Sequence, residues 1–253
     1  MRARFEADGD VVVITGGANG IGAALARAAA TARARVIVCD VDEGAMAALT
    51  AEEPRIVARR LDVSDRVAVL ATFGGIEQDF GAIDGLVCAA AIQPRTPADA
   101  MAAADWQHVM RVNLDGVVWC YQAAVPGMIA RRRGSIVAFT SGLAHQGWPG
   151  AAAYAASKAA LIAFVKSAAK EIAPHRVRFN LIAPGVIDTP QYRAANAGAD
   201  DARWRAFVGV GEPADVVGPL LFLLSDAATM TASIVSRDFA YSAAGDDRAG
   251  EGA

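Results

Sequence analysis

The sequence predicts a single α/β domain built on a Rossmann-type, doubly wound parallel sheet of about seven strands. Short runs rich in β-branched residues recur along the 253 residues, and stretches of helical length separate them. The predicted strands are almost continuously apolar, which is typical of a parallel sheet covered by helices on both faces. Because strand and helix alternate along the whole chain, we expect one doubly wound domain.

Each predicted element follows from its own local pattern. Helical stretches include residues 21–32, which are rich in alanine, and the long amphipathic stretch 105–130. We expect the domain to span residues 1–245 and residues 246–253 to form a disordered tail. The predicted strands cover residues 11–15, 35–40, 55–61, 84–90, 134–141, 177–183 and 233–239.

Composition excludes several classes of function. A net charge of −3 argues against nucleic acid and anionic membrane surfaces as partners. No apolar run approaches the roughly 18 residues that cross a bilayer, and the N-terminus lacks the apolar core of a signal peptide. Cys39, Cys88 and Cys120 show no metal-binding spacing, so we expect core thiols and no metal. These features predict a cytoplasmic protein.

A glycine-rich loop, TGGANGIG at 15–22, follows the first predicted strand and leads into a helix. Glycines allow a tight turn and bring a pyrophosphate close to the free N–H groups of the helix N-terminus. A glycine turn alone could be structural, but its place between the first strand and the first helix favours a dinucleotide site. The predicted cofactor contacts in this loop are Gly16, Asn19, Gly20, Ile21 and Gly22.

An acidic residue, Asp40, ends the second predicted strand. A carboxylate at this point accepts hydrogen bonds from the adenosine ribose and repels a 2′-phosphate. The next residues, Val41, Asp42 and Glu43, bring no compensating cation. The sequence therefore predicts NAD rather than NADP, with Asp40 and Val41 beside the adenosine.

The stretch AAAYAASKAAL at 151–161 carries Tyr154 and Lys158 one helical turn apart. Such a pair can be a plain surface contact. Alternatively, the ammonium lowers the pKa of the phenol, which then exchanges a proton during catalysis.

Together these motifs resemble the short-chain dehydrogenase/reductase family. The glycine loop, Asn113, Ser141, Tyr154 and Lys158 occur in the family's order and spacing, and the resemblance covers residues 8–240. It implies that Tyr154 is the general acid/base and that Lys158 lowers its pKa and binds the nicotinamide ribose. It also implies that Ser141 binds the substrate oxygen and that Asn113 holds a water linked to Lys158.

The resemblance extends to other segments and to assembly. LDV at 61–63, the residues after the fourth strand and IAPGVIDTP at 182–190 resemble cofactor-binding segments of the family. A homo-oligomer, a tetramer or dimer on the long helices that carry Asn113 and Tyr154, is implied as well. The further implied cofactor contacts are Asp62, Val63, Ala89, Ala90, Ala91, Tyr154, Lys158, Pro184, Gly185, Val186, Ile187 and Thr189.

Two stretches depart from the family pattern. CAAA at 88–91 stands where the family usually has NNAG, from which we expect weaker cofactor affinity or a small adjustment of the sheet. Near the C-terminus, Asp238, Phe239 and Ala240 stand where D-G-G is common, so details of assembly are expected to differ.

Side chains in the predicted loops at 93–96, at 143–150 and after Thr189 suggest a polar substrate such as a sugar, polyol or hydroxy acid. Arg95 and Arg193 could clamp a carboxylate or sulfonate, although each loop side chain could equally be exposed or serve packing. Two alternatives remain: a 3-ketoreductase of acyl chains, and a non-catalytic NAD-binding regulator. The candidate substrate residues are Gln93, Arg95, Ser141, Leu143, His145, Trp148, Tyr154, Gln191, Tyr192 and Arg193, with Asn196 in the same segment.

Overall fold

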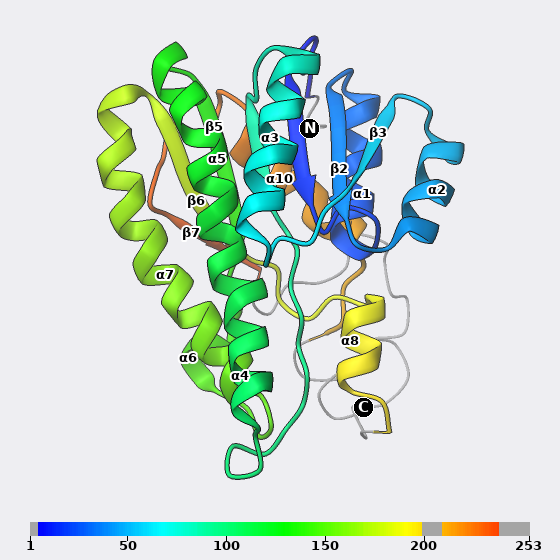
Figure 1. The fold of residues 1–253 in the computed structure, drawn as a ribbon, viewed down its shortest axis with the longest axis vertical. Helices are drawn as coiled ribbons and strands as arrows, with labels where there is room; N and C mark the ends of the chain where they lie inside the picture. Colours follow the sequence, from blue (N-terminus) through cyan, green and yellow to red (C-terminus); the bar gives the residue numbers. More distant parts are fainter. Residues whose placement is uncertain (1–4, 199–208, 238–253) are drawn as a thin grey trace, which may run out of the picture.

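Seven parallel strands form one sheet in the computed structural model, which describes residues 5–198 and 209–237. Their order is β3-β2-β1-β4-β5-β6-β7, so the sheet grows in both directions from β1 (Figure 1). β2 and β3 are added on one side of β1, and β4 and the later strands on the other side. A doubly wound sheet binds its ligand where the strand order reverses in this way, here between β1 and β4. The strands are β1 (Val11–Thr15), β2 (Arg35–Asp40), β3 (Ile56–Arg60), β4 (Gly85–Cys88), β5 (Gly134–Phe139), β6 (Val177–Ala183) and β7 (Ile234–Ser236).

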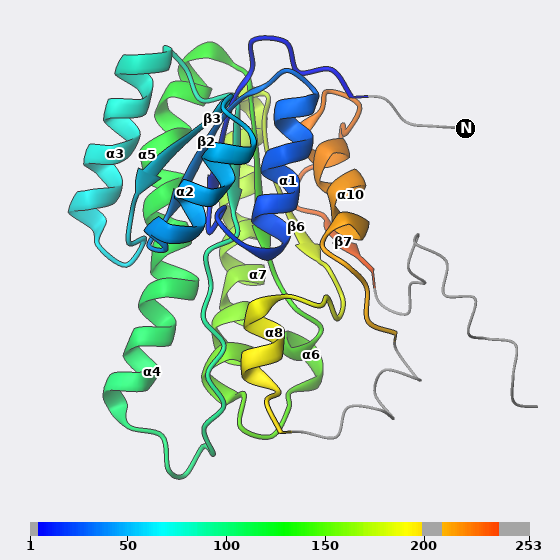
Figure 2. The same ribbon diagram turned by 90° about the vertical axis from the view of Figure 1, so that its right-hand side faces the viewer.

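Helices cover both faces of the sheet (Figure 2). One layer contains α1 (Gly20–Thr31), α2 (Glu43–Glu52) and α10 (Ala214–Leu224). The opposite layer contains α3 (Arg66–Phe80), α5 (Gly116–Arg131) and α7 (Ala152–Ile172).

Strand β1 shows why the predicted strands are continuously apolar. Val12 and Ile14 pack in the core beneath α1 and α10, whereas Val11 and Val13 pack in the core beneath α3 and α5. Because successive side chains of a strand point to opposite faces, a sheet buried on both sides needs apolar residues at every position. The predicted fold class is confirmed.

Several element boundaries differ from the prediction. β4 ends at Cys88 and β5 at Phe139, so Ala89–Ala91 and Ser141 lie in the segments that follow the strands. The last strand covers only Ile234–Ser236. The departures at 238–240 and the tail at 246–253 lie outside the described residues.

The long helix predicted over residues 105–130 is divided by a widened turn. α4 (Ala103–Met110) leads into a π-helical segment, Arg111–Asp115, which continues directly into α5. Asn113 lies in this segment. Widened turns of this kind often occur at functional sites, because they redirect side chains locally.

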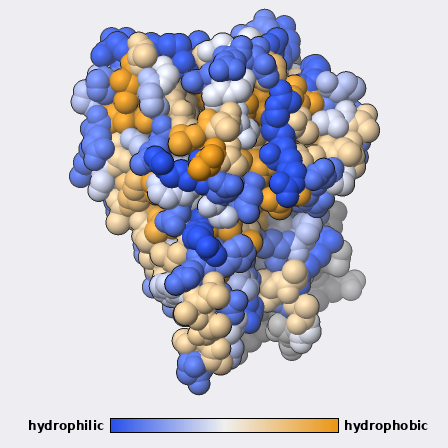
Figure 3. Space-filling view, in the orientation of Figure 1, coloured by the Kyte–Doolittle hydropathy of each residue, from blue (hydrophilic) through white to orange (hydrophobic). Residues whose placement is uncertain are grey.

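Beyond the carboxyl ends of the strands, α4, α6 (Leu143–Gln146) and α8 (Pro190–Ala195) form a lower part of the molecule (Figure 1). α6 and α8 fall within segments predicted as loops. Hydrophobic and hydrophilic residues are intermixed on the face seen in Figure 3. No helix in the described ranges is long and apolar enough to cross a bilayer.

Candidate active site

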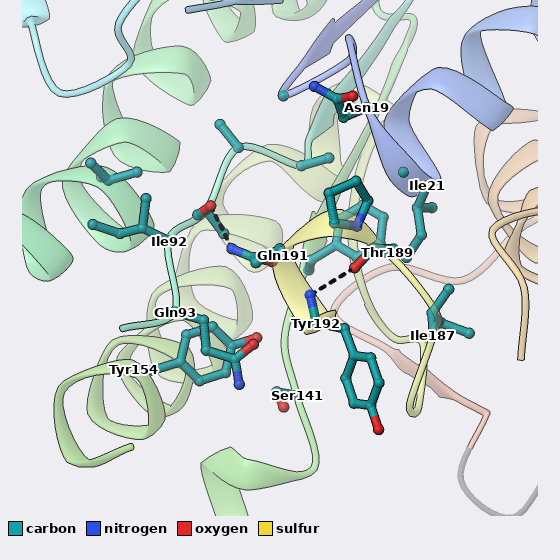
Figure 4. A pocket seen from close by; sticks show the side chains of 18 of the residues that line it. Asn19, Ile21, Ile92, Gln93, Ser141, Tyr154, Ile187, Thr189, Gln191 and Tyr192 are labelled. Atoms are coloured by element: carbon teal, nitrogen blue, oxygen red, sulfur yellow. Dashed lines mark hydrogen bonds between the residues drawn. The ribbon is translucent and has the colours of Figure 1, made fainter. Parts of the chain in front are cut away.

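A cavity of about 1210 Å³ opens at the carboxyl ends of the strands. It extends from the glycine loop and the end of β2 to α7, α8 and the segments after β4 and β5. Figure 4 shows Asn19 and Ile21 on one side and Tyr154, Gln93 and Ser141 on the other. The two predicted sites therefore meet in one space.

The described lining contains all but one of the predicted cofactor contacts. The exception is Gly22 in α1, whose backbone packs so closely on the loop that a Cβ would clash with the carbonyl oxygen of Gly16. The lining residues predicted to contact the cofactor are Gly16, Asn19, Gly20, Ile21, Asp40, Val41, Asp62, Val63, Ala89, Ala90, Ala91, Tyr154, Lys158, Pro184, Gly185, Val186, Ile187 and Thr189.

The glycine loop leaves room for a diphosphate. Gly16 has a φ of +66°, and a Cβ there would lie 2.5 Å from the backbone nitrogen of Ala90, so only glycine fits. Asn19 precedes α1 but makes no side-chain cap, and the first turn of α1 holds no acid. The N–H groups of this turn are therefore suited to an anionic ligand.

Asp40 is held in place by backbone amides. Its Oδ2 accepts a hydrogen bond from the N–H of Ala18 at 3.0 Å, and its Oδ1 accepts one from Val41 at 2.7 Å. The Asn19 amide donates to Asp42 at 3.1 Å, which ties the glycine loop to the start of α2. Of the described lining residues, only Asp40 and Asp62 are acidic.

Lys158 and Tyr154 lie one turn apart on α7, and both line the cavity. The Lys158 ammonium, 2% exposed, donates to the carbonyl oxygen of Phe139 at 2.9 Å. It stands 5.7 Å from the centroid of the Tyr154 ring. The Thr140 hydroxyl donates to the Lys158 carbonyl at 3.2 Å, so α7 is fastened to the end of β5 at this point.

Burial is the largest influence on the pKa values of Tyr154 and Lys158. It raises the pKa of Tyr154, while a hydrogen bond with Ser141 and the charge of Arg95 lower it. Burial lowers the pKa of Lys158 from its usual 10.5 to about 8. The cation that lowers the pKa of Tyr154 in this structure is therefore Arg95, whereas Lys158 is engaged by Phe139.

Asn113 is fully buried behind the cavity and is not among its described lining residues. Its Oδ1 accepts from the Ile92 N–H at 2.8 Å, and its Nδ2 donates to the Ile92 carbonyl at 2.9 Å. The same Nδ2 reaches the Ser157 hydroxyl at 3.2 Å, which donates to the Tyr154 carbonyl at 2.7 Å. Asn113 thus joins the segment after β4 to α7, and its water-binding role stays a prediction.

Most predicted substrate residues line the cavity. Gln191 donates from Nε2 to the carbonyl of Ala91 at 2.6 Å, and the Thr189 hydroxyl accepts from the Tyr192 N–H at 3.1 Å (Figure 4). These bonds place the start of α8 across from the segment after β4. The described lining includes Gln93, Arg95, Ser141, Leu143, Trp148, Gln191, Tyr192 and Asn196.

Two predicted substrate residues lie elsewhere. Neither His145 nor Arg193 is among the described residues of the lining. Arg193 instead pairs with Asp188, with Nε 2.7 Å from Oδ1. A predicted loop assigns no direction to its side chains, so the sequence alone could not separate Arg193 from Gln191 and Tyr192, which do line the cavity.

Sequence reasoning missed several lining residues. Thr140 adjoins Ser141 and Ile92 follows Ala91, so proximity to predicted residues could have found them. His108 and Val112 lie one turn apart on the way to Asn113, and no motif marks them. The missed residues are Leu61, Ile92, His108, Val112, Phe139, Thr140 and Pro190.

The three cysteines are buried thiols, as expected for core residues. Burial raises the pKa of Cys39 to about 12. Within the described ranges, no group of three or more His, Cys, Asp or Glu residues is placed to hold a metal ion.

Comparison with known proteins agrees with this geometry. Residues 10–200 match the family model described as short chain dehydrogenase. The chain belongs to the short-chain dehydrogenase family. Members of this family are oxidoreductases that bind a nicotinamide cofactor, NAD or NADP.

Individual relatives cover nearly the whole chain. Cis-4-hydroxycyclohexanecarboxylate dehydrogenase of Sinomonas cyclohexanicum is 35% identical, over 92% of this chain and 96% of the relative. 3-Oxoacyl-[acyl-carrier-protein] reductase FabG of Thermotoga maritima is 36% identical, over 91% and 97%. The crystal structure of gox2181 has a TM-score of 0.86 at 32% identity and covers 91% of this chain and 95% of that one.

Proposed function

We propose that this short-chain dehydrogenase transfers hydride between NAD and a secondary alcohol or ketone of a polar substrate. The observation that carries the proposal is the shared cavity, in which Ser141, Tyr154 and Lys158 lie at the opposite end from the glycine loop. A cofactor whose diphosphate rests on α1 would extend toward these three side chains.

The bound nicotinamide supplies or accepts the hydride. In alcohol oxidation, the Tyr154 phenolate takes the hydroxyl proton, and in the reverse direction the phenol returns it to the carbonyl oxygen. The Ser141 hydroxyl hydrogen-bonds that oxygen and stabilises its developing charge. Lys158 is placed to bind the nicotinamide ribose, and its charge favours the phenolate once the cofactor completes the site.

Asp40 supports NAD as the cofactor. Its carboxylate lines the cavity on the glycine-loop side, and the other acidic lining residue in the described ranges is Asp62. The cationic side chains Arg95 and Lys158 belong to the Tyr154 end. A 2′-phosphate beside Asp40 would thus meet a negative charge without a neighbouring lysine or arginine among the described lining residues.

The lining supports a polar substrate, since Gln93, Arg95, Gln191 and Asn196 all border the cavity. The relative from Sinomonas is named for a cyclic hydroxy acid, and the relative from Thermotoga is named for an acyl-chain reductase. These two names represent the substrate classes that an assay needs to separate.

The deciding experiment is a survey of cofactor reduction at mildly alkaline pH with NAD and, in parallel, NADP. The panel contains sugars, polyols, hydroxy acids, simple secondary alcohols and a 3-hydroxyacyl thioester. We expect selective NADH formation with a polar alcohol. Turnover confined to NADP and the thioester would instead assign the acyl-reductase function, and NAD binding without any turnover would favour a regulator.

We also propose a homo-oligomer that associates through α5 and α7. Partly buried apolar residues, among them Trp119, Tyr121, Ile162 and Phe164, lie on these helices beside the core. Light scattering of the purified protein tests this, with a dimer or tetramer as the expected mass. A monomer at micromolar concentration would contradict it.

A further inference from the structure

Arg95 lies in the segment that follows β4, and its side chain reaches toward the end of α8. Its Nε donates to the Ala195 carbonyl at 3.4 Å, and its Nη2 donates to the Asn196 side-chain oxygen at 3.5 Å. Both bonds are long for hydrogen bonds to a guanidinium. The neighbouring Thr96 N–H is bonded to the Gly150 carbonyl at 2.8 Å, which fixes the backbone that carries Arg95.

The third nitrogen of this guanidinium has no partner in the part of the chain that the structure describes. Among the described residues, Nη1 of Arg95 is the one buried side-chain nitrogen or oxygen without a hydrogen bond. A buried donor on a charged group that stays unpaired is costly, so native structures rarely retain one without a reason.

No carboxylate among the described lining residues lies beside Arg95 to balance its charge. The acidic lining residues of the described ranges, Asp40 and Asp62, belong to the glycine-loop and β3 side. The ionisable side chain that interacts with the Arg95 charge is Tyr154. Arg95 therefore presents a fixed positive charge beside the proposed proton-transfer residue.

We propose that Arg95 binds the carboxylate of the substrate, which makes the substrate a hydroxy acid or the corresponding oxo acid. This assignment rests on the proposed function, because it takes the alcohol to lie at Tyr154 and Ser141. A carboxylate is the ligand that a planar guanidinium recognises best, through parallel N–H donors. It satisfies Nη1 and neutralises the charge in one contact, while the Arg95 bonds to α8 orient the guanidinium.

The kinetic test compares a hydroxycyclohexanecarboxylate with its carboxamide, which keeps the alcohol and the size but loses the charge. We expect the full-length protein to prefer the acid. In R95A the ratio of kcat/KM for acid over carboxamide should fall about 10- to 100-fold, mainly through KM. R95K keeps the positive charge but loses the parallel N–H donors of the guanidinium, so its acid-to-carboxamide ratio should lie between those of the wild type and R95A.

Arg193→Ala is the matched control. It removes a guanidinium from α8 that pairs with Asp188 and is not among the described lining residues. The acid-to-carboxamide ratio should change by less than about threefold, the size of effect expected of an exposed ion pair. Equal losses in R95A and R193A would indicate a general field effect and overturn the assignment.

A binding measurement separates this proposal from the proposed function. Calorimetry of cyclohexanecarboxylate, which has no alcohol, on the protein with NADH should show binding that R95A loses, whether or not any alcohol is oxidised. If neutral alcohols are oxidised but the carboxylate does not bind, the carboxylate site is wrong and the proposed function stands. If the carboxylate binds but no alcohol is oxidised, the carboxylate site stands and the proposed function is wrong.

Two further arms complete this test. R95K is measured beside R95A, and circular dichroism verifies the fold of each, so that a loss caused by misfolding is recognised. Cyclohexanesulfonate is titrated as well. Tighter binding of the sulfonate than of the carboxylate would overturn the assignment to carboxylic acids.

Discussion

The two ends of the cavity are built in different ways. At the glycine-loop end, recognition depends on backbone: Gly16 lies against Ala90, and the Asp40 carboxylate is itself held by main-chain amides. At the α7 end, long side chains bring positive charge to the cavity: Lys158 is held by Phe139, and Nη1 of Arg95 lacks a partner among the described residues. The backbone fixes the shape of the first end, whereas the second end holds positive charge that no acidic residue of the described lining balances and that a substrate can neutralise.

The largest effect should come from Tyr154→Phe, which separates the two ends. Loss of the phenol hydroxyl should lower kcat by about 100- to 10,000-fold, because no other group takes the substrate proton. NADH affinity, measured by fluorescence titration, should change little, since the glycine-loop end is untouched. A variant that retains most of its turnover would remove Tyr154 from the proposed mechanism.

Gly16→Ala should break the end that is built from backbone. The added Cβ meets the Ala90 backbone at 2.5 Å, and the residue keeps a φ of +66°. We expect the free energy of unfolding to fall by about 2–4 kcal/mol, together with weaker NADH binding.

Gly74→Ala provides the control for this substitution. Gly74 lies within α3, and a Cβ there meets nothing within 4 Å. Its free energy of unfolding, from urea denaturation, should be unchanged or higher by about 0.5–1 kcal/mol. Similar losses in both variants would show that the contact with Ala90 does not decide the outcome.

Lys158→Met tests the buried charge at the other end, in protein without cofactor. The pKa of Lys158 falls from 10.5 to about 8 on folding. Between these values the unfolded chain binds more protons, so the free energy of unfolding of the wild type rises with pH. Relative to K158M the rise should total about 3 kcal/mol between pH 8 and 10.5, measured by urea unfolding at several pH values. Parallel pH profiles would rule out a depressed pKa.

The smallest effect should come from Asp40→Asn, which alters cofactor choice. The amide preserves the shape and one acceptor oxygen but removes the charge. We expect the preference for NAD over NADP, as a ratio of dissociation constants, to fall about 10- to 100-fold. An unchanged ratio would mean that the Asp40 carboxylate does not discriminate between the 2′-hydroxyl of NAD and the 2′-phosphate of NADP.

Local patterns predicted much of this architecture. The strand runs at 11–15, 35–40 and 177–183 coincide with β1, β2 and β6, and the predicted cofactor segments all contribute to the cavity lining. These features depend on residues that are close together in the sequence, such as glycines at a turn or apolar residues in a strand buried on both faces.

Features that depend on distant segments were beyond the sequence. α8 was predicted as a loop, and Arg193 therefore seemed equivalent to Arg95. The folded chain pairs Arg193 with Asp188 and directs Arg95 toward Ala195 and Asn196, a hundred residues away.

By itself, the sequence determined the doubly wound sheet, the glycine loop, the acid at position 40 and the spacing of Tyr154 and Lys158, because each is written in short-range pattern. Only the tertiary structure decided which charges are buried and what faces them. It buried Lys158 against Phe139, made Arg95 the cation that acts on Tyr154, and left Nη1 of Arg95 without a partner among the described residues. The physical reason is that desolvation and hydrogen-bond satisfaction arise from segments that meet only when the chain folds.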